Sequence, residues 1–301
     1  MLRGVTRRRA CELRCEPPFG SAWAASLLLL ACGVRAPGRG DDASLGADRA
    51  QGSVALAPAP SREAPGVPKY PATSVPLSRE SGYLRRAPSP DFWAFAPFYV
   101  GQQDDVSCSL ATLTMLVNAA RRHTRLGTDE PMVAQRLLRR RVNSPVWERG
   151  LAPGGEGVTL DELAVLAAQS LRAFELAPGR VRVTHVPEAS AQALADLREA
   201  LRANEVSGDD WLFVNFLAAA YVGVGDYGHI APVGAYDADA RRVLILDPDR
   251  DWYEPYWVPD EVALAGMATR DSVTGEPRGY LQVSMERDEA ERQTQGMAPS
   301  K

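Results

Sequence analysis

The sequence predicts an α+β fold for the part of the chain that follows residue 88. Three patterns support this class. Apolar residues recur at three- and four-residue intervals over residues 110–117, which is typical of a buried helix. Residues 211–217 form a nearly continuous apolar run, as expected of a central strand. Residues 229–236 and 242–247 are separated by a turn-like stretch, which predicts an antiparallel hairpin.

Four further elements follow from local patterns. The aromatic stretch 91–100 marks the beginning of ordered structure. Thr159 precedes a helical spacing of apolar residues and is therefore the expected N-cap of a helix. Residues 180–186 alternate polar and apolar side chains, as a strand does. Residues 188–204 repeat leucines at helical spacing, which predicts another helix.

Composition divides the 301 residues into four parts. A basic start followed by a short apolar run predicts an export signal over residues 1–36. Residues 37–88 are dense in Pro, Gly, Ala and Ser, and we expect a disordered tether there. One folded domain is expected over residues 89–286, and residues 287–301 are predicted to be a polar tail.

The export signal ends in Leu29-Leu30-Ala31-Cys32, which resembles the lipobox of bacterial lipoproteins. This resemblance implies cleavage before Cys32 and attachment of a diacylglycerol thioether to its sulfur. It predicts a lipoprotein of the bacterial cell envelope, held at the membrane by this anchor. An ordinary secretory signal cut after Ala36, with a periplasmic product, is the alternative, because Glu12 and Glu16 interrupt the basic start.

The formal net charge of -4 is unevenly distributed. Residues 1–36 carry six Arg against two Glu, which leaves about -8 on the remainder. A domain this acidic is a poor candidate for binding nucleic acid, so no such partner is expected. Arg136 and the run 139–141 are interpreted as a solvated helix face rather than as a site for an anionic partner.

Cys108 is the candidate nucleophile, and it is the one cysteine outside residues 1–36. No disulfide framework is therefore possible in the predicted domain. Two acids and Ser107 precede Cys108, a composition typical of a helix start. Unpaired backbone N–H groups and the positive end of the helix dipole favour the thiolate at this position. A small buried hydrophobic residue is the alternative role of a lone cysteine.

His229 and Asp247 provide the other two groups that thiol chemistry needs. Paired positions in a hairpin have a constant index sum, and this pair centres on residue 238, inside the predicted turn. Without a bulge the two residues would be direct cross-strand neighbours, with Cβ atoms about 4.5 to 5.5 Å apart. A carboxylate that orients an imidazole leaves the other ring nitrogen free to act on a thiol. A strand cap for His229 and an Asp-Pro turn for Asp247 are the alternatives.

Two other chemistries are disfavoured. The Cys and His residues show no zinc-type spacing, so no dedicated metal site and no bound cofactor are predicted. The glycines of residues 223–228 precede a strand and not a helix, which argues against a nucleotide-binding loop. His123 and His185 are expected at the surface.

Several motifs together resemble phytochelatin synthase, a papain-like family. The motifs are Gln102 six positions before Cys108, the stretches 157–163, 228–236, 244–250 and 274–280, and Tyr253, Pro255 and 257–259. The similarity runs from about residue 93 to residue 285. It implies a papain-like fold, with a helical part led by Cys108 and a twisted antiparallel sheet that carries His229 and Asp247.

The resemblance also implies a reaction, that of a glutathione γ-glutamylcysteinyltransferase. In this family the thiolate attacks the amide between the cysteine and glycine of glutathione, glycine leaves, and a γ-glutamylcysteinyl thioester forms. Water or a second glutathione then resolves the thioester. The cysteine-rich C-terminal extension of the plant enzymes is absent from this sequence, so we expect hydrolysis to predominate. A heavy-metal ion such as cadmium would arrive as a thiolate complex of the substrate.

The family pattern assigns further site residues. Gln102 and the backbone N–H of Cys108 would bind the developing oxyanion. Arg250 and Tyr253 match positions that contact substrate, with a surface charge as the alternative for Arg250. Ser109 stands where the family usually has glycine and is expected to crowd the cleft. A general papain-like peptidase and an envelope-tethered binding protein without turnover are the competing functions.

Overall fold

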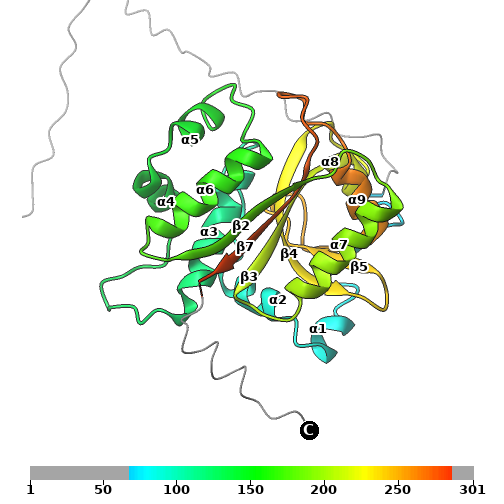
Figure 1. Ribbon diagram of the computed structural model, residues 1–301, viewed down its shortest axis with the longest axis horizontal. Coiled ribbons are helices and arrows are strands. Elements are labelled where there is room, and N and C mark those ends of the chain that lie inside the picture. The colour runs from blue at the N-terminus through cyan, green and yellow to red at the C-terminus, as the bar shows by residue number, and fades with distance from the viewer. Residues whose placement is uncertain (1–67, 287–301) are drawn as a thin grey trace, which may run out of the picture. The chain divides into compact units, whose positions relative to one another are not determined.

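The computed structural model of the protein describes residues 68–286. Helices and an antiparallel sheet make up this part of the chain, which confirms the predicted α+β class (Figure 1). The predicted signal segment with Cys32, residues 37–67 of the predicted tether and the predicted tail all lie outside the described residues. No helix within residues 68–286 is both long and apolar enough to span a bilayer.

The helices and strands follow one another in a mixed order. The helices are α1 (Gly82–Arg86), α2 (Pro90–Phe95), α3 (Cys108–Ala120), α4 (Gln135–Val142), α5 (Pro145–Gly150), α6 (Leu160–Arg172), α7 (Ala191–Asn204), α8 (Ala218–Val222) and α9 (Asp260–Met267), with short 3-10 turns at Ala96–Phe98 and Arg121–His123. The strands are β1 (Val75–Pro76), β2 (Pro178–His185), β3 (Asp210–Leu217), β4 (Gly228–Asp237), β5 (Arg242–Ile245), β6 (Tyr256–Pro259) and β7 (Gly279–Met285). The sheet order is β1-β6-β5-β4-β3-β7-β2, and the paired strands are antiparallel.

Helices cover both faces of the sheet. In Figure 1, α3 to α6 lie on one side and α7 to α9 on the other. Strand β3 contributes Trp211 and Phe213 to the core under α3, and Leu212, Val214 and Phe216 to the opposite core. Because both of its faces are buried, β3 reads as the continuous apolar run that predicted it.

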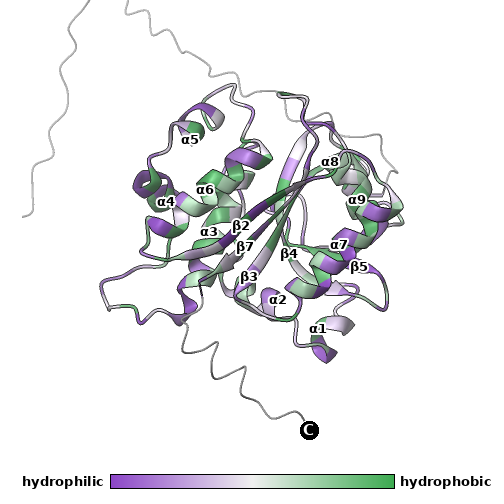
Figure 2. Ribbon diagram, in the orientation of Figure 1, coloured by the Kyte–Doolittle hydropathy of each residue, from purple (hydrophilic) through white to green (hydrophobic). Residues whose placement is uncertain are grey.

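Helix α3 is buried along its entire length. It packs against α4 and α6 on one side and against β4 on the other. Figure 2 accordingly shows hydrophobic residues along α3, whereas α4 carries a hydrophilic surface. A helix enclosed on all sides holds the residue at its first position in a fixed place, and that residue is Cys108.

The predicted hairpin is present as β4 and β5, but its register differs from the expected one. Asp237 pairs with Arg242, and the register shifts by one residue between Val233 and Ala235, where Gly234 is extra. A side chain at position 234 would collide with Leu246, so glycine permits this bulge.

The bulge and the early end of β5 change the pairing of His229. Strand β5 ends at Ile245, so Asp247 lies beyond the ladder, and His229 pairs with Phe216 of β3. The expectation that His229 and Asp247 are direct cross-strand neighbours is therefore wrong.

The expected domain boundary at residue 89 is too late. Val75 and Pro76 of β1 pair with Trp257 and Tyr256 of β6. The Trp257 indole N–H donates to the Glu80 carbonyl oxygen at 2.8 Å. Residues 68–88 are therefore a folded brace on the edge of the sheet and not tether. They lack an apolar period because they combine a two-residue strand with a short helix, and the partners of both lie far away in the sequence.

Removal of this brace is expected to destabilise the domain. We expect a chain lacking residues 1–88 to lose about 3 to 6 kcal/mol of unfolding free energy relative to one lacking residues 1–65. Buried side chains such as Leu84, each worth about 1.5–3 kcal/mol, are lost with it. Urea denaturation of the two truncated chains measures the difference. Equal midpoints would show that the brace contributes nothing.

Candidate active site

Cys108 occupies the first position of α3, where the sequence predicted a helix start. The thiol is free and its residue is 8% exposed. Ser107, the N-cap residue, turns its hydroxyl back to accept hydrogen bonds from the backbone N–H groups of Gln103 and Asp104, at 2.9 and 3.0 Å. This small network fixes the loop that leads into the helix and leaves the first-turn N–H groups near the sulfur.

His229 and Asp247 form a buried pair. The His229 Nε2 atom lies 2.7 Å from Asp247 Oδ1, and the two residues are 4% and 2% exposed. Asp247 Oδ1 also accepts the backbone N–H of Asp249 at 2.8 Å, and Oδ2 accepts the Tyr256 hydroxyl at 2.7 Å. The Tyr99 hydroxyl donates to the backbone carbonyl of Asp247 at 2.5 Å. The carboxylate is thus held on every side although it lies outside the β4–β5 ladder.

The electrostatics of this pair favour its charged form. Burial by itself lowers the pKa of His229, but the charge and hydrogen bond of Asp247, together with the Cys108 thiol, raise that pKa well above its usual range. Burial tends to raise the pKa of Asp247, yet the His229 charge and the hydrogen bonds to the carboxylate lower it. Opposite shifts of the two groups are the signature of an ion pair. Since Nε2 faces Asp247, Nδ1 is the ring nitrogen left for the Cys108 thiol.

Aromatic rings hold the imidazole in place. The Phe216 and Tyr227 rings meet His229 edge-on, with centroids 5.5 and 6.3 Å away. Phe216 is buried, whereas Tyr227 is 42% exposed. Tyr227 follows a glycine-rich turn, so these glycines shape the loop beside His229.

Gln102 lies in the loop before Cys108, and this loop is hydrogen-bonded both to α4 and to the loop that carries Asp247. Its backbone N–H donates to the Pro248 carbonyl oxygen at 2.7 Å. The neighbouring Gly101 carbonyl accepts a hydrogen bond from Gln135 Nε2 of α4, also at 2.7 Å. The half-buried Gln102 is therefore fixed between α4 and the loop that carries Asp247.

Arg250 and Tyr253 have protein partners of their own. The Arg250 guanidinium lies over the Tyr99 ring, 4.3 Å from its centroid, and the side chain is exposed. Tyr253 is 8% exposed and packs edge-on against Tyr70 and Tyr256. Arg250 thus lies at the surface beside the Gln102 loop, and Tyr253 contacts the tyrosine that donates to Asp247.

Ser109 does not crowd the cleft, and that expectation is wrong. Its side chain is fully buried, and its hydroxyl accepts a hydrogen bond from the Trp147 indole N–H of α5 at 3.2 Å. Successive residues of a helix point about 100° apart, so Ser109 faces α5 while Cys108 faces His229. A serine is used here because the buried indole N–H needs an acceptor.

Replacement of Ser109 by alanine is expected to affect stability and not chemistry. The Trp147 N–H would lose its partner, which costs about 1–3 kcal/mol of unfolding free energy. Urea denaturation measures this loss. Ser170→Ala is the matched control, because the Ser170 hydroxyl is equally buried but has no hydrogen-bond partner among residues 68–286. Equal losses in the two variants would contradict the assigned role of Ser109.

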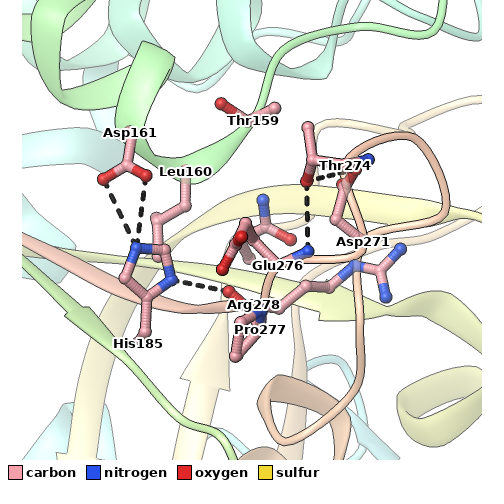
Figure 3. A pocket seen from close by; sticks show the side chains of 10 residues that line it. Thr159, Leu160, Asp161, His185, Asp271, Thr274, Glu276, Pro277 and Arg278 are labelled. Atoms are coloured by element: carbon pink, nitrogen blue, oxygen red, sulfur yellow. Dashed lines mark hydrogen bonds and ion pairs between the residues drawn. The ribbon is translucent and has the colours of Figure 1, made fainter.

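A pocket adjoins the His229 site, and the sequence patterns did not predict it. Figure 3 shows Thr159 and Asp161 of the α6 start facing a loop that carries Asp271 and Arg278. His185 forms part of the wall, with Nδ1 2.6 Å from the Pro277 carbonyl oxygen and Nε2 3.3 Å from the Asp161 carboxylate. His185 is therefore half-buried, and both of its ring nitrogens have a protein partner, whereas the sequence had suggested a surface residue.

Arg278 is the unusual residue of this pocket. It is 3% exposed, and its Nη1 donates to the Thr269 hydroxyl at 3.0 Å and to the Arg270 carbonyl oxygen. Its Nε has no hydrogen-bond partner within the described part of the chain. No carboxylate of that part forms an ion pair with it, and burial lowers the pKa of its guanidinium. A side chain added at Gly228 would lie 2.9 Å from Arg278 Nη2. The guanidinium thus reaches the residue next to His229.

Asn215 adds a second unsatisfied group to the pocket. Its Oδ1 atom is buried and has no partner among residues 68–286. Unpaired buried polar groups are costly unless a ligand or water completes them, so the pocket suits a ligand with both charge and hydrogen-bonding groups. Over the same residues, His, Cys, Asp and Glu side chains form no group of three or more that is arranged to hold a metal ion.

The fold and the site together define a class of protein. It is an α+β protein in which a thiol at a helix N-terminus lies beside a buried imidazole–carboxylate pair. A profile of the phytochelatin synthase family matches residues 76–280, and the chain belongs to this family. The match begins at Pro76 of β1, inside the brace that the composition had suggested to be tether.

Curated relatives agree with this family. Glutathione gamma-glutamylcysteinyltransferase 3 of Lotus japonicus is 29% identical over 197 residues, which are 64% of this chain and 37% of that protein. Glutathione gamma-glutamylcysteinyltransferase 1 of Arabidopsis thaliana is 40% identical over 57 residues, 19% of this chain and 12% of that protein. Glutathione gamma-glutamylcysteinyltransferase of Schizosaccharomyces pombe is 39% identical over 54 residues, 18% of this chain and 13% of that protein. The chain therefore spans well under half the length of these relatives.

Proposed function

We propose that the protein cleaves glutathione, or a related γ-glutamyl thiol peptide, through a γ-glutamylcysteinyl thioester on Cys108. The observation that carries the proposal is the buried His229–Asp247 pair beside a thiol at a helix N-terminus. The names of the relatives point to the same substrate, since each is a glutathione gamma-glutamylcysteinyltransferase.

The first half of the reaction makes the thioester. The Cys108 sulfur attacks the carbonyl carbon of the cysteinyl–glycine amide, while His229 holds the thiol proton. The C–N bond then breaks, His229 gives the proton to the leaving amine, and glycine departs. Asp247 keeps the imidazole oriented and balances its positive charge, a role that its 2.7 Å contact with Nε2 supports.

The second half resolves the thioester. A water molecule attacks the acyl carbon, His229 takes its proton, and γ-glutamylcysteine leaves as the thiol is restored. Attack by the amine of a second glutathione gives phytochelatin instead. We expect water to be the main acceptor, and any cadmium to enter as a thiolate complex of the substrate.

Gln102 and the Cys108 backbone N–H are the proposed donors to the oxyanion. Fixed donors are effective because they need no rearrangement as charge develops, and one donor is typically worth about 2.7–4 kcal/mol. The hydrogen bonds that Gln135 and Pro248 make to the Gln102 loop supply this rigidity. Arg250 stays a candidate contact for a substrate carboxylate because its guanidinium is exposed beside this loop.

The pocket at Arg278 is the proposed site for the γ-glutamyl end of the substrate. Its α-carboxylate would meet the Arg278 guanidinium, whose Nε has no hydrogen-bond partner among residues 68–286, and its α-ammonium group would meet the acids Asp271 and Glu276. The cysteinyl carbonyl would then extend past Gly228 toward Cys108. This arrangement explains why a γ-linked peptide, whose amino-acid end lies away from the reacting amide, suits the site.

The pocket assignment predicts a change in substrate selectivity. We expect Arg278→Lys to raise KM for glutathione at least about tenfold with a smaller change in kcat, because the shorter ammonium group loses the paired contact. A glutathione analogue without the α-carboxylate is the control substrate. The wild type should discriminate against it strongly and the variant hardly at all. Equal discrimination by both proteins would remove Arg278 from the binding site.

Product analysis tests the function itself. The purified protein is incubated with glutathione, with and without cadmium, and glycine, γ-glutamylcysteine and longer thiol peptides are measured. Release of glycine with equimolar γ-glutamylcysteine is the expected result. Cleavage of α-linked peptides in place of glutathione would favour the general peptidase. Binding of glutathione without release would favour a binding protein.

A further inference from the structure

Tyr256, the first residue of β6, is fully buried directly beside Asp247. Its hydroxyl donates to Asp247 Oδ2 at 2.7 Å, the oxygen that does not face His229. Pro76 of the N-terminal brace pairs with Tyr256 across the sheet, and the rings of Tyr70 and Tyr253 pack on it at 5.8 and 6.1 Å. The tyrosine is therefore held by the N-terminal brace and by the loop that precedes β6.

The two oxygens of Asp247 have different partners. Oδ1 accepts from His229 and from the backbone of Asp249, whereas Oδ2 accepts from Tyr256. Because Asp247 is 2% exposed, water does not replace a donor that is removed. Loss of the Tyr256 hydroxyl would leave a charged oxygen buried without its donor.

We infer that Tyr256 is a positioning residue, which acts through Asp247 on the orientation and charge of the His229 imidazole. The inference rests on the proposed function, in which His229 serves Cys108. A donor on Oδ2 fixes the plane of the carboxylate, so Oδ1 stays aligned with Nε2. The same donor draws negative charge away from Oδ1 and weakens its hold on the imidazolium proton.

Other titratable groups surround this network and stay constant in the test. They are Cys108 on α3, Tyr221 on α8, Tyr99, Tyr227, Asp249 and Tyr253 on adjoining loops, and Tyr70 in the brace. Tyr221 is the matched control for Tyr256. It is also fully buried, and its hydroxyl donates a single hydrogen bond of 2.9 Å, but to the Ala263 carbonyl oxygen and not to Asp247.

The test measures the reactivity of the Cys108 thiol directly and needs no substrate. The rate of Cys108 alkylation by iodoacetamide is measured against pH in the full chain, with mass spectrometry of the peptide that contains Cys108. In Tyr256→Phe the carboxylate loses a donor and holds the imidazolium more tightly. The alkaline midpoint of the profile should therefore rise by about 0.5 to 1 pH unit. Tyr221→Phe should keep the wild-type midpoint.

A second variant keeps the test decisive if Tyr256→Phe does not fold. Site-specific 3,5-difluorotyrosine at position 256 retains the shape of the ring and is a stronger donor, so the alkaline midpoint should fall below that of the wild type. A merely structural role of Tyr256 would not shift the alkaline midpoint in opposite directions when the hydroxyl donor is removed and when it is made stronger.

The activity assay separates the positioning role of Tyr256 from the proposed cleavage of glutathione. Glycine release by Tyr256→Phe should fall about tenfold with KM little changed. Shifted alkylation profiles without glycine release by the wild type would support the role of Tyr256 and reject glutathione as substrate. Unchanged profiles in the Tyr256 variants, or the same shift in Tyr221→Phe, would overturn the inference.

Discussion

Cys108→Ala is expected to abolish glycine release from glutathione while the domain stays folded. Without the sulfur no thioester forms, and the His229–Asp247 pair has no nucleophile to serve. Removal of a nucleophile of this kind typically lowers kcat by about 10⁶-fold, so release should drop to background. Colorimetric or mass-spectrometric detection of glycine measures the effect. Binding of glutathione, followed by calorimetry, should survive because alanine leaves the pocket at Arg278 intact.

Ser109→Ala is the matched control for this experiment. Ser109 is the next residue of α3, yet its hydroxyl faces Trp147 and not His229. It should therefore keep wild-type turnover when assayed below its unfolding transition. Release that persists in Cys108→Ala would place the nucleophile elsewhere. Loss of turnover in both variants, with both folded, would point to a packing effect at the start of α3.

Asp247→Asn is expected to have the second largest effect, a fall in kcat of about 10⁴-fold. Asparagine matches the shape of aspartate but cannot balance the imidazolium charge. Burial then dominates the environment of His229 and lowers its pKa, so the alkaline limb of the pH–rate profile should move to lower pH. Steady-state rates from pH 5 to pH 10 measure both changes. Asp249→Asn is the control, because Asp249 contacts Asp247 through its backbone N–H.

The same substitution has a predictable effect on stability. The raised pKa of His229 gives stability that is complete below its unfolded pKa, about 6.5, and is lost as pH rises through the folded value. The lowered pKa of Asp247 gives stability that is complete above its unfolded pKa, about 3.9, and is lost as pH falls through the folded value. The pair therefore stabilises the wild type most between about pH 4 and 6.5. Urea denaturation should show that Asp247→Asn loses this maximum, and an unchanged pH dependence would argue against the ion pair.

The brace and the site are physically connected. Residues 68–88 reach the edge of the sheet at β6, and β6 begins with the tyrosine that donates to Asp247. Truncated proteins made for any of these assays should therefore retain residue 68 onward. A chain that begins at residue 89 would lack the strand that pairs with Tyr256. A loss of activity in such a chain would then report unfolding and not the chemistry under test.

Local patterns were sufficient where a residue's neighbours in the chain decide its structure. Helix α3 begins at Cys108 as predicted, and Thr159 caps α6 through a capping box with Glu162. Strand β3 matches its apolar run, because burial on both faces removes polar residues from the sequence. The family was also readable from motifs alone, and the profile match over residues 76–280 confirms it.

Tertiary contacts decided what chain neighbours do not determine. The bulge at Gly234 and the early end of β5 moved Asp247 out of the ladder, and Tyr256 and the Asp249 backbone hold it against His229 instead. Ser109 turned toward α5 because Trp147 needs an acceptor there.

The brace and the Arg278 pocket depend on partners that are remote in the sequence. Glu80 and Trp257, which join the brace to the sheet, are separated by 177 residues. Periodicity reports which face of an element is buried, but the identity of the partner is set by packing between distant segments. The sequence by itself therefore determined α3, α6, α7 and the strands β2 to β5, the candidate nucleophile and the family. The tertiary structure decided the remaining elements and how the acid, the base and the pocket meet.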